Sequence, residues 1–211
     1  MQSQPVSSVG PQRVTRKQDR RVFRSRMALL SAAVRLVSER RTTALSVTEL
    51  AEAADVSRQL IYLHFGDRDS LLVEAAFDLV RRELVPRVEE CGDDQRRRAL
   101  ACARHYAQYR SFYRAMLIGS CAFEMTRTLS RSFTWLTAQA VRAFFGELDE
   151  DTGADLVTFL AAGSGAMLHN WLIDGGESLD PEELAERLLR VGSVLERRQR
   201  AGVRRSRQSR T

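Results

Sequence analysis

The apolar residues of this chain recur with helical spacing from end to end, and this pattern limits the fold more than any other feature. Between residues 20 and 40 they stand three or four positions apart, at Phe23, Met27, Leu30, Val34 and Val37. Such spacing places them on one face of an α-helix. No long segment alternates apolar and polar residues, as a half-buried strand would. We therefore expect an all-α protein.

Capping residues divide the segment after residue 40 into three more helices. The second helix should begin after Ser46, which has the spacing of a capping box with Glu49. The third should begin after Ser57 and end at Gly66, and a longer fourth should cover 67–85. The second and third are short and joined by a tight turn, which is the arrangement of a helix-turn-helix.

The C-terminal part contains further helices, of which the last two are the clearest. Loops are expected at 91–94 and 146–153, and helices at 154–174 and 181–197. The first of these helices carries a run of small residues at 161–166, which would let another backbone approach closely. A symmetric homodimer that buries both helices is the simplest interpretation.

Composition is that of a globular protein, with 211 residues, 44% of them hydrophobic and 28% charged. No run approaches the roughly 18 apolar residues of a membrane helix, and the N-terminus lacks the apolar segment of a signal peptide. The three cysteines are odd in number and form no CxxC pair. We expect reduced thiols, a cytoplasmic location and no membrane partner.

Charge is unevenly distributed along the chain. Residues 1–46 carry a net charge of +8, residues 47–195 one of −8 and residues 196–211 one of +6. A basic N-terminal segment ahead of an acidic body suggests that this end meets a polyanion. The segment 1–19 resembles an arm that could lie along a DNA groove, although a passive tail is equally consistent. For 197–211 a solubilising tail is the favoured interpretation.

The expected third helix has two different faces. On a period of 3.6 residues Ile61 and Phe65 point inward, whereas Arg58, Gln59 and Tyr62 point outward near the helix N-terminus. Arginine can bridge two acceptors on guanine, glutamine can bridge adenine, and tyrosine can reach a phosphate. Spacing alone leaves an ordinary solvated helix face as an equal alternative.

The stretch 45–72, LSVTELAEAADVSRQLIYLHFGDRDSLL, resembles the DNA-binding domain of the TetR family of bacterial transcriptional repressors. The most specific part runs from Val56-Ser57-Arg58 through Tyr62-x-His64-Phe65 to Asp67-Arg68-Asp69-x-Leu71-Leu72. The resemblance implies a three-helix DNA-binding domain over 20–66 and a helical bundle for ligand binding and dimerisation over 67–196. The charge distribution adds a basic extension over 1–19 and a basic tail over 197–211.

The resemblance also implies which residues meet operator DNA. Base contacts would fall on Arg58, Gln59 and Leu60, the last against a thymine methyl. Phosphate contacts would fall on Thr48, Ser57, Tyr62, His64 and Arg68. The chain departs from the family at Arg41 and Asp55, where members commonly have glycine. These two departures concern the turn geometry, because a left-handed backbone suits aspartate moderately and arginine less.

Aromatic and methionine side chains are dense in the C-terminal part. Most must fill the core, but some could line a pocket for a small apolar effector. The five candidates are Phe77, Tyr106, Phe123, Trp135 and Met167. The helix over 67–85 would carry a ligand-induced shift from Phe77 to the DNA-binding end.

Signals of catalysis are missing from the sequence. No Walker loop, Gly-x-Gly-x-x-Gly fingerprint, nucleophile elbow or metal-spaced histidine pair occurs, so we expect no enzyme, catalytic residue, metal or cofactor. The sequence favours a dimeric DNA-binding regulator that leaves a palindromic operator when an effector binds. The alternative is a helical-bundle enzyme or sensor whose helix-turn-helix is incidental.

Overall fold

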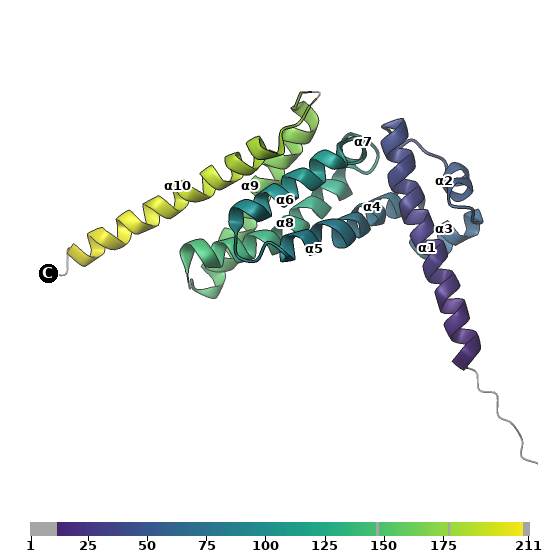
Figure 1. Cartoon of the computed structure of the whole chain (residues 1–211), viewed down its shortest axis with the longest axis horizontal. Helices are drawn as coiled ribbons and strands as arrows, with labels where there is room; N and C mark the ends of the chain where they lie inside the picture. The colour runs from purple at the N-terminus through teal and green to yellow at the C-terminus, as the bar shows by residue number, and fades with distance from the viewer. Residues whose placement is uncertain (1–11, 147, 177, 209–211) are drawn as a thin grey trace, which may run out of the picture.

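The computed structural model describes residues 12–208 apart from 147 and 177, and every regular element in that part of the chain is helical (Figure 1). The all-α expectation is therefore confirmed. In chain order the elements are α1 (Gln12–Arg40), α2 (Val47–Ala53), α3 (Arg58–Phe65), α4 (Arg68–Leu79), the π-helix η1 (Val80–Leu84), α5 (Val85–Glu89), α6 (Gln95–Gln108), α7 (Arg110–Ile118), α8 (Ala122–Phe145), α9 (Glu150–Asp174) and α10 (Pro181–Gln208).

Helices α1 to α3 form a small head at one end of the molecule, and the C-terminal part of α10 extends at the opposite end (Figure 1). Of the predicted stripe on α1, Leu30 and Val37 are buried beside Leu50 and Ile61, and Met27 and Val34 are partly buried. Phe23 is 63% exposed, because it lies in the N-terminal part of α1, before the packed length of the helix. The head is thus organised around the α1 face that the spacing predicted.

Three helix ends differ from the predicted ones. Helix α1 begins at Gln12 rather than near residue 20, and α10 continues to Gln208 rather than ending near 197. Helix α9 begins at Glu150, not 154, because the side chain of Asp149 accepts a hydrogen bond from the backbone N–H of Thr152 at 3.0 Å. An apolar stripe marks only the packed length of a helix, and good helix formers such as arginine and glutamine extend it further.

The predicted fourth helix is interrupted by a π turn at η1. Its N-cap Asp67 accepts from the N–H of Ser70 at 2.7 Å, as expected, but the helix continues past Pro86 to Glu89. Proline has no N–H to donate, and its ring clashes with the carbonyl four residues earlier. The N–H of Val85 instead bonds the carbonyl of Val80, which accommodates the proline without ending the helix.

The body consists of η1 and the helices α4 to α10. Helix α8 packs along α9, and α6 packs along α10. Aromatic side chains fill the centre, with Tyr106, Phe112 and Tyr113 at most 1% exposed. His105 is also fully buried, and its Nε2 lies 2.8 Å from the Tyr113 hydroxyl. Burial, together with the positive charge of Arg87, lowers the His105 pKa to about 4.

Head and body meet where α1 packs against α4 and α7, and where the loop between α7 and α8 contacts the loop after α1. The backbone N–H of Ser120 donates to Oγ1 of Thr43, a buried residue of the loop after α1, at 3.2 Å. Gly119 comes so close to Thr43 that a Cβ at this position would overlap the threonine hydroxyl and lie 2.8 Å from the carbonyl oxygen of Ala115. This junction therefore needs glycine for close approach, and its backbone φ of −93° is ordinary.

Candidate nucleic-acid interface and ligand cavity

The turn between α2 and α3 is set by local contacts. Ser46 caps α2 in the predicted capping box, in which its Oγ accepts from the N–H of Glu49 at 3.1 Å and its own N–H donates to the Glu49 carboxylate at 2.7 Å. Hydrogen bonds from Ser46, first from its backbone N–H, lower the Glu49 pKa to about 2. Asp55 then turns the chain with a φ of +51°.

Helix α3 presents its polar face to solvent. Arg58, Gln59 and Tyr62 are exposed, whereas Ile61 is fully buried and Phe65 is 9% exposed. The predicted orientation of this helix is confirmed. Arg58 and Gln59 occupy its first turn, and recognition helices meet base edges through this end.

The other predicted contact residues divide by exposure. Thr48 and Ser57 are exposed at the head surface, and Ser57 occupies the N-cap position of α3 without a side-chain capping bond. Leu60 is half-buried and packs against the core. Leu63, which the sequence analysis did not select, is 75% exposed. Its position four residues after Gln59 could have identified it, because residues i and i+4 share a helix face.

The structure limits how His64 and Arg68 could contact a phosphate. The Nε2 atom of His64 is buried without a hydrogen-bond partner among the described residues, so its Nδ1 is the atom left for a phosphate. The guanidinium of Arg68 donates to the carbonyl of Leu45 at 3.3 Å and to Oγ of Ser120 at 3.1 Å. In this arrangement Arg68 holds head and body together.

Arg26 fixes α3 against the other helices of the head. Its guanidinium carbon lies 4.5 Å from the centre of the Phe65 ring, and its Nη1 donates to the carbonyl of His64 at 3.1 Å. Its Nη2 also pairs with the carboxylate of Glu74 on α4. One side chain of α1 thus links α3 to α4, which holds the exposed face of α3 in a defined orientation.

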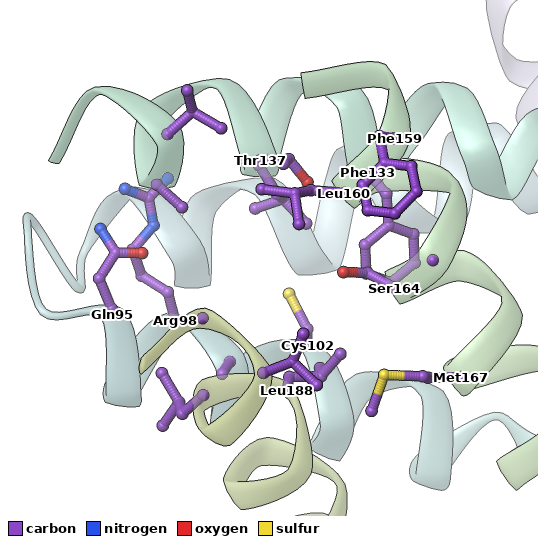
Figure 2. A pocket seen from close by; sticks show the side chains of 18 of the residues that line it. Gln95, Arg98, Cys102, Phe133, Thr137, Phe159, Leu160, Ser164, Met167 and Leu188 are labelled. Carbon is purple, nitrogen blue, oxygen red and sulfur yellow. The ribbon is translucent and has the colours of Figure 1, made fainter. Parts of the chain in front are cut away.

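The body contains an apolar cavity of about 400 Å³ between α6, α8, α9 and α10 (Figure 2). Small-molecule sites typically measure about 300–1,000 Å³. Its wall is mostly aliphatic and aromatic, and Gln95, Arg98, Thr137 and Ser164 provide side-chain polar groups. Burial raises the pKa of the Cys102 thiol in this wall to about 12, so the thiol is neutral.

The structure does not bring the five predicted effector-binding residues together. Only Met167 lines the cavity. Phe77 lines a separate cleft at the head–body junction, and Tyr106 is buried behind the wall, stacked on Phe133 at 6.3 Å between ring centres. Phe123 and Trp135 are 73% and 39% exposed and lie outside the cavity lining. A count of aromatic residues could not distinguish core, surface and cavity positions.

Comparisons with known proteins identify the head. A family model described as "Bacterial regulatory proteins, tetR family" matches residues 29–75, from within α1 to within α4. A solved structure of a putative TetR-family transcriptional regulator from Rhodococcus sp. is 25% identical, with a TM-score of 0.52 over 82% of this chain and 98% of that one. The chain belongs to the TetR family. This TetR-family protein is therefore a DNA-binding transcriptional regulator.

Two further solved structures share the fold of this chain. The dihydroxyacetone kinase operon activator DhaS is 16% identical, with a TM-score of 0.56 over 82% of this chain and 96% of that one. NalD, the secondary repressor of the MexAB-OprM multidrug efflux pump in Pseudomonas aeruginosa, is 21% identical, with a TM-score of 0.51 over 80% of this chain and 93% of that one. No curated protein matched.

The two departures from the family pattern coincide with the two left-handed non-glycine residues of the described chain. Arg41 has a φ of +54° and Asp55 a φ of +51°. Glycine adopts this backbone without strain, whereas a Cβ crowds the following carbonyl. Both positions therefore have a left-handed backbone to which glycine is better suited.

Proposed function

We propose that this regulator is a dimeric repressor that binds a palindromic operator and leaves it when a small molecule enters the body. The observation that carries the proposal is the outward face of α3, where Arg58 and Gln59 are exposed in the first turn while Ile61 and Phe65 anchor the opposite face. These side-chain types can read guanine and adenine in the major groove. We assign Arg58, Gln59 and Leu63 to bases, and Thr48, Ser57 and Tyr62 to phosphates.

The dimer proposal rests on apolar surface that the single chain leaves exposed. Phe159 on α9 is 72% exposed, and Val191 and Val194 on α10 are 47% and 52% exposed. Helix α9 is also the one helix in the described part of the chain that is long and apolar enough to cross a membrane, and 28% of its most apolar stretch is buried. Its Leu168 and Leu172 pack in the body core, so we assign its exposed face to a second copy rather than to lipid.

The cavity is our candidate effector site, and α8 is the element that would transmit binding. Phe133 and Leu136 of α8 line the cavity, and the same helix begins beside Ser120, which bonds Thr43 and Arg68 at the junction. A ligand that displaces α8 would shift the head relative to the body. Only a ligand with different affinities for the two arrangements can change DNA binding.

Repression by occupancy is the simplest action for a chain with this organisation. We divide it into the head, through Gly66, and the body, from Asp67 onward. The protein would act in the cytoplasm, where its operator lies. The repressor NalD and the activator DhaS share the fold, so an in vitro transcription assay from the bound promoter decides the sign of regulation.

Footprinting on the DNA that flanks the coding region tests the proposal. A dimer with two reading helices should protect a palindrome whose half-sites are a whole number of duplex turns apart. A helical-bundle enzyme or sensor with an incidental helix-turn-helix would protect no discrete site on any genomic fragment. That outcome would refute the regulator proposal.

A further inference from the structure

Among the described residues, Arg98 is a buried cation with no hydrogen-bonding or ion-pair partner for its side chain. The residue is 6% exposed and lines the cavity, and its side chain forms no ion pair or hydrogen bond with any described residue. Its neighbours Arg96 and Arg104 both pair with Glu182 on the other side of α6. A guanidinium does not lose its proton in a protein, so burial without an anion is unfavourable.

The cavity has its charged side chain at one end and most of its labelled aromatic side chains toward the other (Figure 2). Figure 2 shows Arg98 and Gln95 together at one end, and Phe133, Phe159 and Met167 toward the other. Arg98 is the only residue with a formal charge among the described residues that line the cavity. It also lies in the first turn of α6, whose N-terminal backbone N–H groups add partial positive charge. An occupant therefore meets positive potential at one end and hydrocarbon at the other.

We propose that the cavity binds an amphipathic carboxylate, an organic acid with an aliphatic or aromatic tail. The carboxylate would accept a bidentate pair of hydrogen bonds from Arg98, with the amide of Gln95 as a further donor. The tail would pack against Cys102, Leu188 and Met167. This inference rests on the proposal that the cavity is the effector site, and it replaces the apolar effector expected from the sequence with an anionic one.

Calorimetric titration of the full-length protein with decanoate and with decanol tests the proposal. The two probes share a tail and differ in charge, so the wild type should bind decanoate more tightly. Arg98→Met should weaken decanoate binding on the order of 10-fold to 100-fold and leave decanol binding unchanged. Arg98→Lys, which keeps the charge, should lose less affinity for decanoate than Arg98→Met. Arg97→Met removes an exposed arginine of the same helix and should change neither affinity.

Thermal unfolding separates a binding role from a structural one. If the role of Arg98 is to bind an anionic ligand, its charge is uncompensated in the ligand-free protein. Arg98→Met removes this charge and should raise the melting temperature of the ligand-free protein. A variant that melts earlier and binds both probes poorly would make Arg98 a structural residue and overturn the proposal. Equal binding of decanoate and decanol by the wild type would overturn it too.

Operator binding measured in the same preparations keeps the two proposals apart. Protein that binds its operator but takes up decanoate no better than decanol would refute the carboxylate site and leave the regulator intact. Uptake of decanoate that depends on Arg98 but does not release the operator would confirm the site and refute its role as the effector site.

Discussion

Arg68 donates from Nη1 to the backbone carbonyl of Leu45 at 3.3 Å, across 23 residues of sequence. Its Nη2 reaches Oγ of Ser120 in the body at 3.1 Å, and the carboxylate of Asp69 completes the set of partners. The first residue of α4 thus joins the loop before α2 to the loop before α8. A change in the body that moves Ser120 must disturb Arg68, so this contact is one physical link between body and head.

Base reading by α3 can be tested at Arg58. Arg58→Ala should cost about 1–3 kcal/mol on the operator and relax preference at one position in each half-site. Tyr62→Phe, which removes only a phosphate-directed hydroxyl, should weaken all sequences alike by about 0.5–1.5 kcal/mol. Quantitative binding to a library of operator variants measures both effects. If Arg58→Ala binds every variant as the parent does, the base contact is misassigned.

The dimer interface can be tested at Phe159. A charge placed in a buried apolar contact is strongly unfavourable, about 3 kcal/mol or more, so Phe159→Glu should sediment as a monomer. Phe123→Glu is a matched control, because Phe123 is 73% exposed against 72% for Phe159 and lies on α8 near the head. Leu188 is a poorer probe because it packs against the protomer core. A dimeric Phe159→Glu protein would move the interface elsewhere.

Close approach at the head–body junction can be tested at Gly119. Gly119→Ala should destabilise the protein by about 1–3 kcal/mol, because the new Cβ overlaps the Thr43 hydroxyl. Combining it with Thr43→Ala should give a loss smaller than the sum of the two single losses. Gly176→Ala, which faces open space, is the control. Urea denaturation of the wild type and the four variants measures these losses of stability. Strictly additive losses for Gly119→Ala and Thr43→Ala would contradict the contact.

Backbone strain at Arg41 predicts that a glycine substitution stabilises the protein there, whereas a glycine substitution at Ser31 destabilises it. Arg41→Gly should stabilise the protein by up to about 1 kcal/mol, because glycine relieves the left-handed strain and only part of that gain is offset by chain entropy. Ser31→Gly, at an exposed position within α1, should destabilise by about 0.5–1 kcal/mol. Melting temperatures that fall for both variants would show that Arg41 is unstrained.

Buried His105 predicts a loss of stability in mild acid. Its pKa is lowered from 6.5 to about 4, so between these values the unfolded chain binds a proton that the folded protein does not. Unfolding therefore becomes easier as the pH falls through this window, by about 2 kcal/mol at pH 5 relative to neutral pH. His105→Gln should remove this part of the pH dependence. Urea denaturation of the wild type and His105→Gln at pH 7 and pH 5 measures how much stability each protein loses in acid. Equal losses in the two proteins would contradict the assignment to His105.

Local interactions explain what the sequence determined about this protein. The capping box of Ser46 and Glu49 and the cap at Asp67 each depend on residues three positions apart, so their signals are complete within one helical turn. The orientation of α3 follows in the same way, because Ile61 and Phe65 share a face at a spacing of four. The resemblance over 45–72 rests on these same local features. The assigned DNA contacts themselves stay predictions.

Tertiary structure decided what depends on distant residues. The cavity draws its wall from four helices, so the place of Arg98 as its one charged residue among the described lining residues depends on how α6, α8, α9 and α10 pack together. The sequence did not indicate that Phe77 lines the cleft beside Ser120 rather than the cavity. It also did not indicate that the Arg68 guanidinium donates to Ser120, which lies 52 residues later in the chain. Helical periodicity specifies which face is buried, but the identity of the surface that buries it is set by packing across the whole chain.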